Sequence, residues 1–273
     1  MSTAIAAALA VSLPACKQQP TGNEAASAEP AAASLDALNG TWKVDLASLK
    51  FSGKPYEYTL KDGSWNCASC IPPLTVAADG QFHAVTDQPY YDSMSVKQVD
   101  DRTIDIHRKK GDKEVSSSNL QVSEDGNTLT VKFKDMTAPT TIEGSTTFTR
   151  AGPAPAGAHA LSGQWQPNRI GEYTEEGLDI SLQISGDTVT SSSQGQSYTA
   201  TLGGPAVAMQ NDPGGTMVTV ERAGSGIKET YSRDGKEVGI ATITPSADGK
   251  SISVSSTDPR DGTSTDFTAN KKS

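Results

Sequence analysis

The residues with the clearest chemical potential are two cysteines, Cys67 and Cys70, separated by two positions. Such a pair can form a local disulfide, carry out thiol–disulfide exchange or bind a metal. Exchange chemistry favours a cysteine at a helix N-terminus, where the thiol pKa falls. Pro72 and Pro73 follow directly and oppose a helix there. We therefore expect a structural Cys67–Cys70 disulfide, which an oxidising compartment favours, and retain a thiol-redox role as the least favoured reading.

A metal site is a second possibility for the same cysteines. His83 follows at a distance that suits a third zinc ligand, but the next histidine, His107, lies well beyond the usual spacing for a fourth. Haem attachment requires a histidine directly after the second cysteine, and Ile71 stands there. Zinc binding therefore remains a minor alternative, and we expect no cofactor.

The rest of the chain gives little support for catalysis or nucleic-acid binding. Among its 273 residues are three histidines, and it contains no serine-hydrolase, zinc-protease, phosphate-loop or dinucleotide-binding motif. The formal net charge is −9, and the largest basic cluster is Arg108-Lys109-Lys110, whereas nucleic-acid binding needs an extended basic face. We expect neither an enzyme nor a nucleic-acid partner.

The N-terminal region has the pattern of an exported protein. An apolar run at residues 4–13 has the length of a signal-peptide core and is too short to span a bilayer. Leu13-Pro14-Ala15-Cys16 follows it and resembles the lipobox of bacterial lipoproteins. The resemblance implies a signal peptide at 1–15 and lipidation of Cys16; the alternative is an ordinary secretory signal. Residues 16–37, poor in large apolar side chains, are predicted to form a disordered tether.

The lipoprotein pattern also implies a location. A lipidated Cys16 would hold the protein on a membrane at the periplasmic face of the cell envelope. Lys17 stands where an inner-membrane lipoprotein often has Asp, which favours the outer membrane.

An internal repeat organises the remaining sequence. Leu38-Asn39-Gly40-Thr41-Trp42 recurs as Leu161-Ser162-Gly163-Gln164-Trp165 at an offset of 123 positions. The same offset relates three further pairs: Met94 and Met217, Lys113-Glu114-Val115 and Lys236-Glu237-Val238, and Asp125-Gly126 and Asp248-Gly249. A period this long indicates duplicated domains rather than a solenoid. We predict domains at 38–150 and 161–273, joined by a Pro/Ala linker at 151–160.

Both copies read as all-β. Segments such as 56–60, 127–133 and 178–184 alternate apolar and polar residues, and Asp-Gly turns separate them. No convincing amphipathic helix occurs. The pattern predicts two tandem antiparallel β-barrel-like domains, since closure removes exposed sheet edges.

The opening strand and the end of each copy resemble the lipocalin and calycin family. Gly40-x-Trp42 with Arg150 matches the family pattern, in which a basic residue of the last strand stacks on the tryptophan. Gly163-x-Trp165 matches in the second copy, with the cation supplied by Lys271 or Lys272. The resemblance implies a barrel with a cavity for an apolar ligand. A barrel filled by its own side chains is the alternative.

The first copy carries most of the aromatic residues, which favours it as the binding domain. Our hypothesis is a lipid-anchored envelope protein whose first domain binds a small apolar ligand. The alternative is a structural or adaptor module with an envelope protein partner and no ligand. The candidate ligand-binding residues are Tyr56, Tyr58, Trp65, Phe82, Tyr90 and Tyr91.

Overall fold

The computed structural model describes residues 34–272, and this part of the chain is almost entirely β-structure. The predicted signal peptide, the lipidation site Cys16 and most of the tether lie outside the described residues. The last residues of the predicted tether are ordered instead, because Leu35 lies in a short helix and is buried in a hydrophobic core. Three short 3₁₀ helices are present: η1 (Leu35–Leu38), η2 (Leu46–Ser48) and η3 (Glu175–Leu178). The all-β prediction, with two antiparallel barrel-like sheets, is confirmed.

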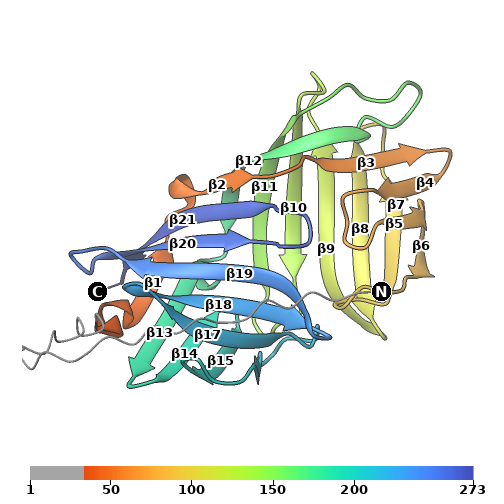
Figure 1. The fold of residues 1–273 in the computed structure, drawn as a ribbon. Coiled ribbons are helices and arrows are strands. Elements are labelled where there is room, and N and C mark those ends of the chain that lie inside the picture. The colour runs from red at the N-terminus through yellow and green to blue at the C-terminus, as the bar shows by residue number, and fades with distance from the viewer. Residues whose placement is uncertain (1–33, 273) are drawn as a thin grey trace, which may run out of the picture. The chain divides into compact units, whose positions relative to one another are not determined.

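We name the sheet built from β3 to β12 the N-terminal barrel (Figure 1). Its strand order is β5-β4-β3-β12-β11-β10-β9-β8-β7-β6. Its strands are β3 (Tyr56–Lys61), β4 (Ser64–Cys67), β5 (Leu74–Ala77), β6 (Asp79–Ala84), β7 (Ser93–Gln98), β8 (Thr103–Lys110), β9 (Lys113–Val122), β10 (Thr128–Asp135), β11 (Ile142–Arg150) and β12 (Gly163–Tyr173).

The other sheet, which we name the C-terminal barrel, has the order β15-β14-β13-β1-β21-β20-β19-β18-β17-β16, and β2 also pairs with β21. Its strands are β1 (Gly40–Val44), β2 (Lys50–Ser52), β13 (Asp179–Ser185), β14 (Thr188–Ser193), β15 (Gln196–Thr201), β16 (Val207–Ala208), β17 (Met217–Ala223), β18 (Gly226–Arg233), β19 (Lys236–Pro245), β20 (Ser251–Thr257) and β21 (Ser264–Lys271).

The two barrels exchange their opening strands. β1, which carries the first Gly-x-Trp, pairs with β13 and β21 in the C-terminal barrel. β12, which carries the second, pairs with β11 and β3 in the N-terminal barrel. Each sheet therefore takes its opening strand from the other half of the sequence. The two sheets thus do not follow the predicted domain ranges 38–150 and 161–273. Because the two copies are alike, the opening strand of either can complete either sheet, and repeat spacing cannot distinguish these arrangements.

The repeat extends to the geometry of individual turns. In the β9–β10 hairpin, Asp125 Oδ1 accepts hydrogen bonds from the Ser123 hydroxyl and the Asn127 amide, at 2.6 and 3.1 Å. In the β19–β20 hairpin, Asp248 does the same with Ser246 and Lys250, at 2.7 and 3.1 Å. The glycine after each aspartate has a positive φ, 76° and 66°, which explains why glycine follows it.

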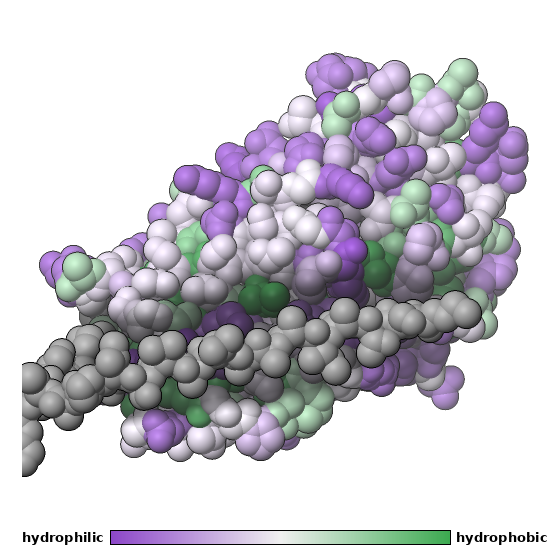
Figure 2. Space-filling model, viewed as in Figure 1, coloured by the Kyte–Doolittle hydropathy of each residue, from purple (hydrophilic) through white to green (hydrophobic). Residues whose placement is uncertain are grey.

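Each barrel has its own hydrophobic core. In the N-terminal barrel the large buried side chains include Trp65, Met94 and Trp165. In the C-terminal barrel they include Trp42, Ile227 and Ile252. Figure 2 shows one face of the molecule, on which polar residues predominate and hydrophobic ones occur in separate patches. The apolar side chains of the alternating strands thus point into the cores, as the sequence indicates.

Candidate functional site

The tryptophans of the two Gly-x-Trp motifs are held in the two cores in the same way. Trp42 and Trp165 are fully buried. The indole Nε1 of Trp42 donates to the Leu38 carbonyl at 3.0 Å, and that of Trp165 donates to the Leu161 carbonyl at 2.7 Å. A buried indole needs such an acceptor, and the residue four positions earlier supplies it in both copies.

A cation covers each tryptophan, as predicted from the sequence, but the predicted pairing is wrong. Arg150 lies 4.1 Å from the ring centre of Trp165 rather than on Trp42. Lys271 lies 5.0 Å from that of Trp42 rather than on Trp165. The exchange of opening strands is the reason. Lys272 instead forms an ion pair with Asp179, at 2.7 Å.

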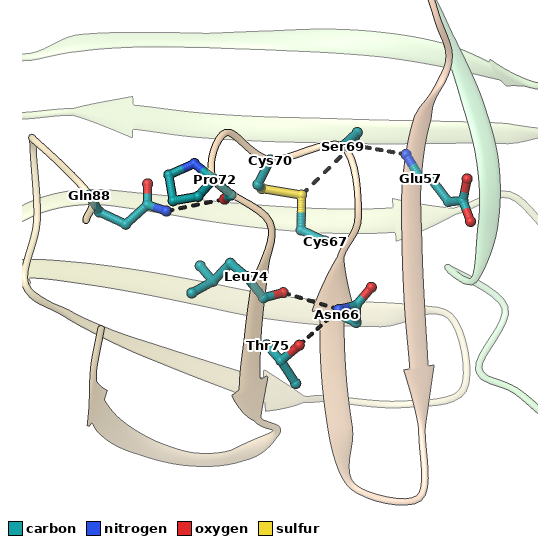
Figure 3. The surroundings of a disulfide bond; sticks show 9 residues. All are labelled: Glu57, Asn66, Cys67, Ser69, Cys70, Pro72, Leu74, Thr75 and Gln88. Atoms are coloured by element: carbon teal, nitrogen blue, oxygen red, sulfur yellow. Dashed lines mark hydrogen bonds between the residues drawn. A yellow bond between two sulfur atoms is a disulfide. The ribbon is translucent and has the colours of Figure 1, made fainter. Parts of the chain in front are cut away.

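Cys67 and Cys70 are joined in a disulfide at the end of β4 (Figure 3). The Ser69 hydroxyl within the loop accepts a hydrogen bond from the Glu57 amide at 3.0 Å, which ties the loop to β3. The Pro72 carbonyl accepts from Gln88 at 3.4 Å. In this form neither sulfur is a free thiolate that could bind zinc or attack a substrate.

The two histidines considered as zinc ligands are each paired with a carboxylate. His83 lies 2.9 Å from Asp79, and His107 lies 2.7 Å from Glu114. Within residues 34–272, no three His, Cys, Asp or Glu side chains come together in a group that could hold a metal ion.

The six aromatic residues proposed as a ligand site lie in three places. Tyr56, Tyr58 and Trp65 form one stack, with ring centres 6.4 and 6.0 Å apart. Its outer end is open, since Tyr56 is 40% exposed, whereas Trp65 belongs to the core. Phe82 is exposed, and the ammonium group of Lys109 covers its ring at 4.1 Å.

The remaining two candidates, Tyr90 and Tyr91, line a cavity of about 440 Å³. Arg233 of the C-terminal barrel covers the Tyr90 ring at 4.7 Å and donates a hydrogen bond to its hydroxyl. Arg108 of β8 covers the Tyr91 ring at 5.3 Å.

A different cavity contains the strongest functional candidate, and sequence reasoning missed it. The C-terminal barrel contains an open cavity of about 430 Å³, partly lined by Ile180, Met209, Ile243, Val254, Phe267 and several serines. Glu229 of β18 also lines it and is only 3% exposed.

Two tyrosines hold the Glu229 carboxyl group. The Tyr198 hydroxyl donates to one carboxyl oxygen and the Tyr231 hydroxyl to the other. Ser191, which also lines the cavity, is hydrogen-bonded to Tyr198. None of the described residues that line this cavity is Lys, Arg or His, so the acid has no cationic partner there.

Burial controls the ionisation of this group. Desolvation raises the pKa of Glu229 above its ordinary value, and the hydrogen bonds from Tyr198 and Tyr231 oppose that rise. Burial, followed by the field of Glu229, raises the pKa of both tyrosines, so they remain protonated donors. A cavity-lining acid with a perturbed pKa is a candidate functional group, because a buried charge is costly to keep without a role.

The repeat itself identifies Glu229 as unusual. The offset of 123 places Glu229 opposite Ile106 and Tyr231 opposite Arg108. Ile106 is a buried core residue of the N-terminal barrel. A polar residue at a core position of an otherwise conserved pattern is the signal that could have revealed the site.

Comparison with known proteins finds no family model that matches the chain and no curated protein with a matching sequence. Among the described residues, no helix has both the length and the apolar character needed to cross a membrane.

Proposed function

We propose that this protein is a binding protein whose C-terminal barrel holds a small organic cation, such as a protonated amine with a short apolar body. The observation that carries the proposal is Glu229, a buried carboxyl group inside a cavity that has no basic lining residue. A ligand ammonium group would supply the missing counter-charge and hydrogen-bond donors.

The shape and lining of the cavity suit such a ligand. Its volume of about 430 Å³ falls within the range of small-molecule sites. Ile180, Ile243 and Phe267 offer apolar contact, while Tyr198 and Tyr231 fix the orientation of the acid. The net charge of −9 also favours the approach of cations. In this proposal the cation site lies in the second barrel, whereas the aromatic content of the sequence pointed to the first copy.

The test compares three ligands of one length: hexylammonium, hexanol and hexanoate. Binding is measured by isothermal titration calorimetry at neutral pH and low salt. We expect hexylammonium to bind most tightly and Glu229→Gln to weaken it about 10- to 100-fold, because a hydrogen bond to a charged group contributes about 1.5–3 kcal/mol.

The matched control is Glu237→Gln, which removes the same charge from an exposed position. It should leave hexylammonium binding unchanged. Equal affinity of hexylammonium for the wild type and Glu229→Gln, or tighter binding of hexanol, would overturn the proposal.

We further propose that the chain is a lipoprotein anchored through Cys16 at the periplasmic face of the envelope, with the outer membrane favoured. The support is the lipobox-like Leu13-Pro14-Ala15-Cys16 after an apolar run, together with a disulfide, which oxidising compartments favour. Metabolic labelling with an alkyne fatty acid should tag the wild type and not Cys16→Ser. Labelling of both, or of neither, would contradict the anchor.

A further inference from the structure

A second cavity, lined by residues of both barrels, differs from the one that holds Glu229 in the charged group it contains. Its volume is about 440 Å³, and Arg108, Val115 and Ser116 of strands β8 and β9 line it with Tyr90 and Tyr91. The loop after β10 contributes Ala138 and Thr140, and the C-terminal barrel contributes Gln194 and Gln196. Arg108 is therefore the cationic group of a cavity whose lining mixes tyrosine and aliphatic side chains with serine, threonine, glutamine and one aspartate.

Arg108 has hydrogen-bond donors to spare. Its guanidinium stacks on Tyr91 and donates to the Ser116 hydroxyl at a long 3.4 Å. Among residues 34–272, no carboxylate lies within ion-pair distance of it. By contrast, Arg150 donates to three backbone carbonyls, at 2.6, 2.9 and 2.6 Å.

One acid also lines this cavity, but it is already engaged. Asp135 accepts hydrogen bonds from the amide and the hydroxyl of Thr137, at 2.9 and 2.6 Å. It is exposed, whereas Arg108 is half-buried. Asp135 makes no ion pair with Arg108, so the guanidinium keeps hydrogen-bond donors for a ligand carboxylate.

The repeat shows that this charge is specific to one copy. Arg108 and Tyr231 occupy equivalent positions, 123 residues apart, and Tyr231 serves Glu229. The same inward position thus provides a cation in one barrel and a phenol that supports an anion in the other. A guanidinium with free donors in one cavity and a buried carboxyl group in the other are expected to favour ligands of opposite charge.

We propose that this cavity is a second binding site, in which Arg108 binds the carboxylate of a small organic acid with a short apolar body. A guanidinium can hold a carboxylate through two parallel hydrogen bonds. Val115, Ala138 and Ile142 provide apolar contact for the rest of the ligand. Its charged group differs from the one at Glu229, although Gln194 and Gln196 line both cavities.

The probe is hexanoate, titrated into the wild type, Arg108→Met and Arg102→Met by calorimetry at low salt. Arg102 is an exposed turn residue, so its variant matches the change in charge away from the cavity. We expect Arg108→Met to weaken hexanoate binding at least tenfold and Arg102→Met to leave it within about twofold.

Binding of hexylammonium to Arg108→Met should equal that of the wild type, which separates this site from the one at Glu229 and shows that the variant is folded. If Arg108→Met does not fold, Ser116→Phe, which places a ring in the cavity and keeps the arginine, should abolish hexanoate binding instead. Failure of hexanoate to bind the wild type, or undiminished binding to the folded cavity variant, would overturn the proposal.

Discussion

Replacement of Glu229 by glutamine should change how stability depends on pH. The raised pKa of Glu229 means that the folded protein holds this proton more tightly than the unfolded chain does, where the ordinary value is 4.5. The resulting stabilisation is fully present below pH 4.5 and is lost as pH rises through the folded pKa. Glutamine has no proton to lose, so Glu229→Gln lacks this dependence.

The slope of the unfolding free energy against pH follows from the binding of one proton. Where the folded state holds the proton and the unfolded state has lost it, the stability of the wild type falls by up to about 1.4 kcal/mol per pH unit. The free energy of unfolding of Glu229→Gln, minus that of the wild type, should therefore increase as pH rises above 4.5. Loss of one tyrosine hydrogen bond adds a constant offset that does not depend on pH.

The assay is urea unfolding of the wild type, Glu229→Gln and Glu237→Gln at half-unit steps between pH 4.5 and 8. Asp79 and Asp125, whose pKa values are lowered mainly by side-chain hydrogen bonds, contribute equally to all three proteins and cancel in the differences. A difference between Glu229→Gln and the wild type that stays flat, or decreases with pH, would refute the reasoning.

Three further predictions concern the framework. Arg150→Met should lower the free energy of unfolding by about 3–5 kcal/mol in denaturant titrations, because it removes three charged hydrogen bonds and a ring contact. Lys271→Met removes only a ring contact and should lower the free energy of unfolding by about 0.5–1 kcal/mol. Reduction of Cys67–Cys70 should lower the free energy of unfolding by about 2 kcal/mol, because the loop is short. Gly226→Ala should cost about 3 kcal/mol in the same assay, because a Cβ there would lie 2.0 Å from the Ile243 carbonyl oxygen.

Each framework prediction has a result that contradicts it. Equal losses for Arg150→Met and Lys271→Met would mean that the carbonyl contacts contribute little. A much larger loss on reduction would mean that the disulfide does more than close a short loop. For Gly226→Ala the control is Gly63→Ala, where a Cβ would meet nothing within 4 Å. That control should cost only the strain of its positive φ, about 1 kcal/mol.

The fold class was accessible from the sequence, because alternation and turn chemistry act locally. Asp125-Gly126 and Asp248-Gly249 lie in hairpins as predicted. The glycine and tryptophan of each Gly-x-Trp motif lie in strands that pair with strands distant in the sequence. The exchange of β1 and β12 was not accessible from the sequence, because both strands carry the same pattern. Each of them could pair with the neighbouring strands of either sheet. That exchange also reversed the partners of Arg150 and Lys271.

The candidate site shows a different limit. Aromatic content pointed to Tyr56, Phe82 and their neighbours, but the number of rings says nothing about whether they share one surface. Glu229 lies on a strand whose sequence has the usual mixture of apolar and charged residues, so nothing in that strand alone marks it. Its inward position becomes evident only when Ile106 is placed opposite it through the repeat.

The most direct test of the cation-binding account is the identity of what the protein carries. The untagged wild type and Glu229→Gln, purified from the producing cell, would be extracted with organic solvent and analysed by mass spectrometry. We predict a molecule with a basic nitrogen, near one per chain in the wild type and depleted in Glu229→Gln. Equal amounts in both proteins, or nothing above background in the wild type, would contradict the account.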